Sequence, residues 1–271
     1  ANPLVPLSLF RSRRFAVINL STLLIYGALY VTFSFQSLFV QGALGYSALA
    51  AGAVGLPIGL LLTALSARVG ALAGRLGARR FLVGGPLLMA AGRAWLARVP
   101  ASSDAWRATI ADPGSLIPPS DTLIDIAPGV VLFGIGISLV VAPLTTVLMS
   151  SVPVRHAGLG SAINNAISRV GQPLLSAVIF IVVTAGYASA LAAAVPGLDP
   201  ADPAIRRLVP PLNVPAEGTP TVLAEAARAA STDAFHLAAL VCATLLVAGA
   251  IVNLVGLREP RPGADGEGSG E

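Results

Sequence analysis

Between Arg14 and Arg68 the chain carries 53 consecutive residues without a charged side chain. About 20 apolar residues in a helix cross the hydrocarbon core of a bilayer, so this stretch is long enough for two crossings joined by a turn. Further apolar stretches follow it. We expect six transmembrane helices, at about residues 15–40, 47–69, 81–96, 128–150, 158–185 and 234–257. The sequence therefore predicts an all-α integral membrane protein.

The composition excludes several other classes of protein. Only 11% of the 271 residues are charged, whereas a soluble domain has about 25%. All 17 basic residues are Arg, scattered between apolar runs rather than clustered as a nucleic-acid surface requires. Cys242, the only cysteine, excludes disulfide frameworks and cysteine-based metal sites and is expected to be a small buried hydrophobe. With no catalytic constellation in the sequence, we predict no enzyme, cofactor or metal site.

The arginines predict the orientation of the helices. Cytoplasmic loops carry an excess of basic residues, and here one side collects ten Arg while the other has five Arg and nine acidic residues. The ten are Arg11, Arg13, Arg14, Arg68, Arg75, Arg79, Arg80, Arg155, Arg258 and Arg261. We expect both termini to be cytoplasmic.

The remaining segments have the composition of loops and tails. Residues 1–14 form a cytoplasmic lead-in to the bundle of residues 15–257, and the Gly-, Glu- and Pro-rich residues 258–271 form a disordered tail. Two outer loops, residues 100–127 and 187–233, are long. The first is expected to be mostly irregular, and the second to contain a short surface helix at residues 220–230. With neither an initial Met nor a signal peptide, we expect a fragment of a longer protein.

One motif stands between the second and third predicted helices. It reads Gly70-Ala-Leu-Ala-Gly74-Arg75-Leu-Gly77-Ala-Arg79-Arg80. Small glycines allow two helix ends to approach in a tight loop, and the arginines keep that loop at the cytoplasmic surface. An ordinary basic turn would explain the pattern if it stood alone. The motif at residues 70–80, however, resembles the signature loop of the major facilitator superfamily, Gly-x-Leu-Ala-Asp-Arg-x-Gly-x-Arg-Arg, except that Gly74 replaces the Asp.

Further segments extend the resemblance over most of the chain. Residues 6–11, 41–47 and 152–162, with Asn164, Asn165 and Arg169, are similar to the C-terminal six-helix half of the fourteen-helix (DHA2-like) drug:proton antiporters. In that family two six-helix bundles surround a cavity and rock to alternate its access. The resemblance implies an N-terminal half as partner, a bacterial inner-membrane location, a small amphipathic substrate and a proton gradient as energy source. Because the family's Asp helps latch the cytoplasmic gate, Gly74 is expected to weaken that latch.

The resemblance also assigns roles to helices: the first and fourth line the cavity, and the second and fifth form gates and contact the other half. At about 100° per residue, polar and aromatic side chains share one face of each cavity helix. The candidate substrate-cavity residues are Asn19, Tyr26, Tyr30, Ser138 and Thr145. For the tyrosines, packing between helices is an equal alternative.

The fifth predicted helix carries the most polar face, formed by Asn165, Arg169 and Gln172 with Ser168. Such groups are costly in lipid and must face protein or water, so this stripe is a candidate gate or structural element. Arg169 has three candidate roles: bonding to carbonyls at a gate, binding substrate, or reaching the cytoplasmic surface. We expect its stripe neighbours to accept its hydrogen bonds. Arg93, near the outer end of the third helix, is expected to extend outward rather than bind anything.

The six predicted helices contain no Asp or Glu, so any proton-coupling carboxylate must belong to the other half. The sequence as a whole favours the C-terminal half of a secondary transporter that exports drugs in exchange for protons. Two alternatives stay open. One is a permease or exporter of the same superfamily for a metabolite such as an amino acid or a sugar, and the other is a membrane scaffold without transport.

Overall fold

The computed structural model describes residues 7–257, and this part of the chain is helical with no β-strand. Its six long helices confirm the predicted all-α class. They are α1 Arg13–Leu38, α2 Ala48–Leu76, α3 Ala78–Leu96, α4 Ala127–Ser150, α5 Ala157–Ala194 and α7 Thr221–Gly256. A short helix, α6 Pro203–Leu208, lies in the second outer loop, and π-helical turns occupy Phe39–Ala43 and Thr122–Ile126. The expected tail, residues 258–271, and the first six residues of the lead-in lie outside the described part.

Three helices run further than the apolar stretches indicated. α2 continues to Leu76 and α5 to Ala194, while α7 begins at Thr221 and includes the short surface helix expected at residues 220–230. The length of an apolar run reflects the thickness of the hydrocarbon core. A helix can continue past that run wherever the residues have high helix propensity. The extensions are rich in Ala, the best helix former. As a result, α7 contains two acidic residues at its outer end, Glu225 and Asp233.

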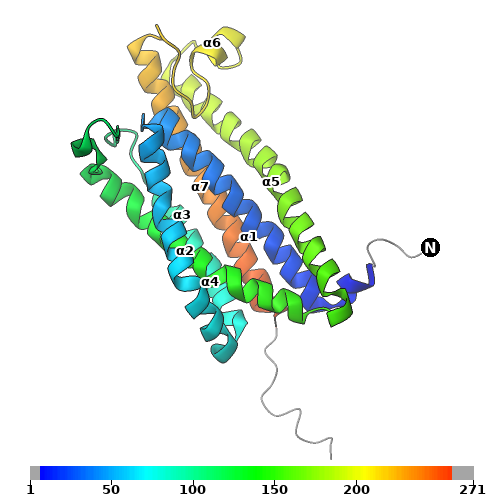
Figure 1. Cartoon of the computed structure of the whole chain (residues 1–271). Coiled ribbons are helices and arrows are strands. Elements are labelled where there is room, and N and C mark those ends of the chain that lie inside the picture. Colours follow the sequence, from blue (N-terminus) through cyan, green and yellow to red (C-terminus); the bar gives the residue numbers. More distant parts are fainter. Residues whose placement is uncertain (1–6, 258–271) are drawn as a thin grey trace, which may run out of the picture.

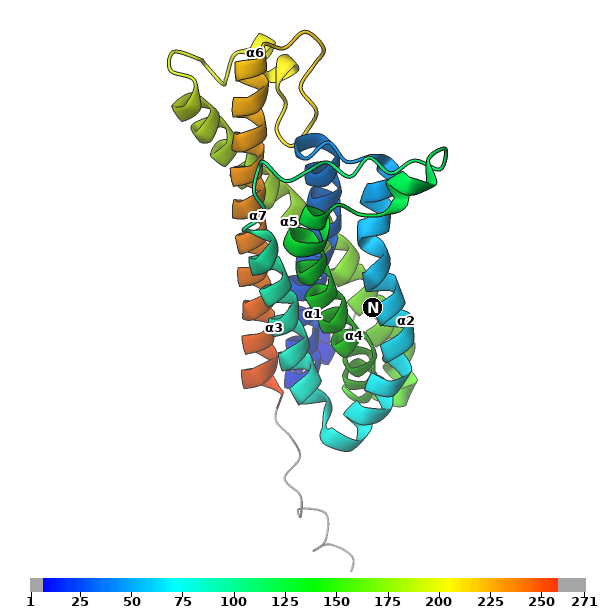
Figure 2. The same ribbon diagram turned by 90° about the vertical axis from the view of Figure 1, so that its left-hand side faces the viewer.

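Five helical segments of the described chain have the length and hydropathy of membrane spans, which makes this a multi-pass membrane protein. The exception is α3, which has 19 residues and carries Arg79, Arg80 and Arg93. It nevertheless packs extensively along α4 and α7 within the bundle (Figure 2). Its place among the other helices, rather than its composition, identifies it as the sixth crossing.

The six helices form two groups of three. α1, α5 and α7 pack together on one side, α2, α3 and α4 on the other, and α3 joins the groups by packing on α7 (Figure 1). α1 and α5 make only sparse contacts with α4. α1 begins and α7 ends at the same end of the bundle, which also holds the α2–α3 turn (Figure 1). We call this the inner end and the opposite one the outer end.

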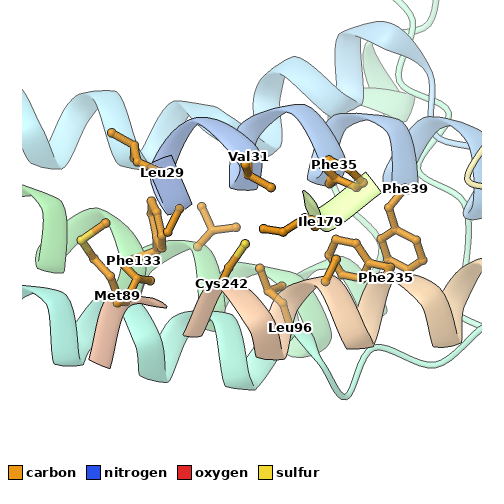
Figure 3. Close-up of a cluster of buried hydrophobic side chains, with 14 of the residues drawn as sticks. Leu29, Val31, Phe35, Phe39, Met89, Leu96, Phe133, Ile179, Phe235 and Cys242 are labelled. Carbon is orange, nitrogen blue, oxygen red and sulfur yellow. The ribbon is translucent and has the colours of Figure 1, made fainter. Parts of the chain in front are cut away.

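Paired glycines bring α3 and α4 into backbone contact. A Cβ atom placed on Gly85 would lie 2.8 Å from the carbonyl oxygen of Gly136, and one placed on Gly92 would lie 2.5 Å from that of Gly129. No side chain fits at such distances. Around this seam lies the apolar core, where Phe35, Phe133 and Cys242 come from three different helices (Figure 3). Cys242 is 1% exposed, as expected for a small buried hydrophobe.

Two adjacent glycines of α3 test this seam. The added methyl group of Gly85→Ala would meet Val140 Cγ2 at 2.6 Å as well as the backbone of α4, whereas that of Gly84→Ala would meet nothing within 4 Å. We expect Gly85→Ala to lower stability by about 1–3 kcal/mol through overpacking. Gly84→Ala should leave it unchanged or raise it slightly. Thermal melting of the purified protein measures both, and equal melting temperatures for the two variants would contradict close α3–α4 contact.

Candidate functional site

The helices differ sharply in how much surface the bundle leaves open. In the most apolar 18-residue stretch of α2, 17% of the residues are buried, and in that of α5, 22% are. The corresponding value for α1 is 61%. Large apolar side chains project from both, among them Leu60 on α2 and Ile181 on α5. These two helices therefore offer their surfaces to lipid or to another part of the protein.

The polar stripe predicted on the first helix is divided in the structure. Tyr26 and Tyr30 on α1 are half-buried neighbours with ring centroids 6.4 Å apart. Asn19 is 2% exposed and lies between helices, where its Oδ1 accepts a hydrogen bond from Asn164 Nδ2 of α5 at 3.1 Å. Asn164 Nδ2 also donates to Thr22 Oγ1 at 2.9 Å. Asn19 thus ties α1 to α5, while the tyrosines keep partly open faces.

Asn164 is part of the motif that carries the family resemblance, but sequence reasoning selected only its neighbour Asn165 as a site residue. Of two consecutive asparagines on α5, Asn164 is 8% exposed and bonds to α1, whereas Asn165 is exposed. Successive residues of a helix point about 100° apart, so one of such a pair can face the bundle and the other its surroundings. Asn164 is recognised only in the structure, from its position opposite Asn19 and Thr22.

The two candidates on α4 have different surroundings. Ser138 is fully buried, and its Oγ donates to the carbonyl oxygen of Gly134 at 2.7 Å. This part of α4 is packed by α2 on one side and α3 on the other, since a Cβ atom on Gly134 would approach Ile58 and one on Gly136 would approach Met89. Thr145 is exposed. Of the five predicted cavity residues, Tyr26, Tyr30 and Thr145 therefore present surface outside the packed bundle.

The polar stripe on α5 points away from the bundle. Asn165 and Arg169 are exposed and Gln172 is partly exposed. The expectation that the stripe neighbours accept hydrogen bonds from Arg169 is wrong: among the described residues the Arg169 side chain has no hydrogen-bond partner, and Ser168 Oγ donates to the carbonyl of Asn165 instead. A guanidinium in that position is free to meet water or groups outside this bundle.

Arg93 is buried inside the bundle, although its sequence position predicted that it extends outward. Its side chain is 1% exposed, its Nη1 donates to Gln36 Oε1 of α1 at 3.1 Å, and its guanidinium carbon lies 5.3 Å from the ring centroid of Phe235. The expected outward extension is therefore wrong. α7 runs beyond the end of α3, with His236 Nε2 2.9 Å from the carbonyl oxygen of Val99, so the last turn of α3 lies inside the bundle.

The signature motif folds into a tighter turn than expected. α2 ends at Leu76 and α3 begins at Ala78, so Gly77 alone connects them, with a φ of 86° that favours glycine. Gly70 and Gly74 lie within α2 rather than in a loop, which corrects that expectation. A Cβ atom on Gly74 would meet nothing within 4 Å, so the residue that replaces the family's Asp stands at an open surface.

The basic residues of the motif divide into bound and exposed ones. Arg79 Nε donates to the carbonyl oxygen of Leu254 at 3.2 Å, and its Nη2 donates to the same oxygen. Arg13 Nη2 reaches the next carbonyl, that of Val255, at 3.0 Å. The last carbonyls of a helix lack partners within it and carry partial negative charge, so two guanidinium groups cap the inner end of α7. Arg75 and Arg80 are exposed.

At the outer end, the first long loop is mostly irregular, as expected, and it covers the helix ends as a cap. Ser47, in the α1–α2 turn, binds it twice, donating from its backbone N to Trp106 O at 3.1 Å and from Oγ to Ala108 O at 2.7 Å. From α7, Arg228 Nη2 donates to Ser103 O at 3.0 Å. Residues 97–121 thus connect the outer ends of both helix groups (Figure 2). In the part of the chain that the structure describes, no cluster of His, Cys, Asp or Glu is arranged to hold a metal ion.

The cap on α7 gives a direct prediction for the signature motif. Replacing Arg79 by Gln removes the charge from the last turn of α7, and we expect a loss of about 0.3–1 kcal/mol of local stability. Backbone amides of that turn should then exchange with deuterium faster, measured by mass spectrometry. Arg80→Gln is the matched control because Arg80 is exposed. If both variants speed exchange equally, Arg79 has no specific role at α7.

Comparison with known proteins identifies the family. The model of the Major Facilitator Superfamily matches residues 1–176. "Multidrug resistance protein Stp" of Mycobacterium tuberculosis is 28% identical over 191 residues, which are 70% of this chain and 32% of that protein. "Uncharacterized MFS-type transporter EfpA" of the same organism is 31% identical over 183 residues, 68% of this chain and 32% of that protein. The chain thus spans about a third of the length of the curated relatives it matches.

Proposed function

Because the chain belongs to the major facilitator superfamily, a family of membrane transporters and not of enzymes, we propose that it forms the C-terminal six-helix half of a drug exporter. In this proposal a second six-helix half completes the cavity, and the two halves rock to open it to either side of a bacterial inner membrane. The multidrug resistance named in Stp supports drugs as the substrate class.

One observation carries the proposal: the polar stripe Asn165, Arg169 and Gln172 lies on an open face of α5. A guanidinium facing hydrocarbon is expensive, so membrane helices direct such groups toward protein or a water-filled cavity. α5 is also one of the two least buried helices. A second half packed against α2 and α5 would supply both the protein surface and the water.

The open side chains suit an amphipathic substrate. Tyr26 and Tyr30 on α1 and Thr145 on α4 combine aromatic surface with hydroxyl groups, the mixture that small-molecule sites use to orient largely apolar ligands. Phe33, which is 42% exposed on α1, adds to the aromatic surface. We propose these four side chains as this half's part of the cavity.

We propose a proton gradient as the energy source, with the titratable group in the other half. The acidic residues that the structure places in long helices or next to them, Asp121, Asp125, Glu225 and Asp233, lie at the outer end of this bundle. None stands beside the proposed cavity face. This half would then provide cavity wall and gate.

The proposed orientation places the inner end, with both termini, in the cytoplasm. Single cysteines at exposed positions test it: Ser102→Cys and Val214→Cys in the two outer loops, and Gly74→Cys near the α2–α3 turn. A membrane-impermeant maleimide added to intact cells should label the first two and leave the third unlabelled until the membrane is opened. The reverse pattern would invert the topology. The native Cys242 is buried and should not react.

Arg169 tests the transport proposal itself. In the transporter that contains this chain, we expect Arg169→Ala to abolish most drug efflux while membrane insertion stays normal, since removing a charge does not hinder insertion. Arg169→Lys should restore only part of it, because a point charge lacks the planar five-donor fork of Arg. Efflux is compared at matched membrane levels, with Arg155→Ala, at an exposed position just before the same helix, as control. Wild-type efflux from Arg169→Ala would rule out this site, and a scaffold would show no efflux at all.

A further inference from the structure

Arg93 is a fully buried cation that the proposed cavity does not use. It lies in the last turn of α3 with its guanidinium near the ring of Phe235, which belongs with Phe39 and Leu96 to the apolar core (Figure 3). Among residues 7–257, no carboxylate lies within ion-pair distance of its guanidinium. Burying a charge without a counter-charge is costly, so this residue lowers the stability of the bundle.

Both of its specific contacts lead to the outer third of α1. The first is the hydrogen bond from Nη1 to Gln36 Oε1. The second passes through Phe235 of α7: the guanidinium lies near this ring, and the ring stacks on Phe39 with centroids 3.9 Å apart and planes 4° from parallel (Figure 3). Phe39 begins the π-helical turn Phe39–Ala43 that ends this span. Arg93 thus fixes α1 at two points, just before the turn and at its first residue.

This end of α1 has little other support from the cavity side. α1 touches α4 only sparsely, through contacts such as the edge-on packing of Phe33 on Phe133 at 6.3 Å, and its main packing partners are α5 and α7. The proposed cavity residues Tyr26 and Tyr30 lie within two to three turns of Gln36 on the same helix. Because Gln36 and the two tyrosines belong to one continuous helix, a displacement at Gln36 would be passed on to them.

The hydrogen bonding around Arg93 is incomplete, which argues against a purely stabilising role. Arg93 Nε is buried without a hydrogen-bond partner. Buried donors without acceptors cost stability, and replacing a buried charged group by an apolar one is often neutral or stabilising. A methionine here would fill similar space at lower cost.

We propose that Arg93 is a positioning residue for transport, holding the outer third of α1 through Gln36 and the Phe235–Phe39 stack so that the tyrosine face meets its substrate. This inference rests on the proposed function. It assigns Arg93 no contact with the substrate and predicts an effect on apparent affinity that is transmitted through α1.

The first test measures transport by the complete transporter in membrane vesicles, with KM and maximal rate determined separately. We expect Arg93→Met to raise KM about tenfold at normal abundance, because displacing a binding face by a fraction of an ångström is enough for such a loss. Arg93→Lys should recover less than half of it, since an ammonium cannot both bond to Gln36 and stack on Phe235. The matched control is Arg98→Met: Arg98 lies just beyond the end of α3, is exposed, and has its guanidinium carbon 3.8 Å from the ring centroid of Trp95. Its KM should not change.

A pair of variants keeps the test decisive if folding is affected. Gln36→Leu alone strands the guanidinium and should lower membrane abundance more than the double variant Arg93→Met/Gln36→Leu, from which charge and acceptor are both removed. The double variant should still show the raised KM. A normal KM in both Arg93→Met and the double variant would overturn the proposal and leave Arg93 a packing residue.

The last test needs no transport. Ser37→Cys, exposed on α1 next to Gln36, reports the position of this end through its rate of maleimide labelling. We expect Arg93→Met, and not Arg98→Met, to change that rate severalfold. If wild-type protein moves no drug, the proposed function fails while labelling still decides the role of Arg93. Identical labelling rates in wild type and Arg93→Met would show that Arg93 does not position α1.

Discussion

Helices in hydrocarbon gain little by hiding apolar side chains from one another, because the lipid tails are equally apolar. Cohesion must come from close backbone approach and from the few polar bonds that cross between helices. The glycine seam of α3 and α4 provides the first. Asn164 on α5 bonded to Asn19 on α1, and Asn253 Nδ2 on α7 bonded to the carbonyl of Leu82 on α3 at 2.8 Å, provide the second. The packing of the two helix groups depends on these contacts.

The same constraint separates two kinds of polar residue. Those whose hydrogen bonds are met inside the bundle, such as Asn19 and Ser138, belong to its architecture. Those that face outward, such as Arg169, need a partner that the bundle does not supply. α2 and α5 carry most of the open surface, which agrees with the gate and interface roles that the family resemblance gave them. Exposure therefore distinguishes the residues proposed for transport better than polarity alone.

The number of helices and their order were predictable because the bilayer imposes one length on every crossing, and charges mark its borders. The helix ends were not, since α5 and α7 continue into water on alanine-rich sequence. Periodicity placed the polar residues of α1 on one face, but it could not say that Asn19 meets α5 whereas Tyr26 and Tyr30 stay partly open. The position of Arg93 near the outer end of α3 was predictable, whereas its burial depends on how far α7 extends beside it. Such facts belong to the packing of distant segments and have no local signal.

The single residue between α2 and α3 has a mechanical consequence. With only Gly77 joining them, the inner ends of the two helices have no slack, and Arg79 next to it is fastened to the last turn of α7. Arg13 fastens the start of α1 to that same turn. A force that tilts α2 at this end would therefore be passed to α3, α7 and α1 together, so these connections favour movement of the bundle as one body. In the proposed two-half transporter, bending would then occur between the halves rather than within this one.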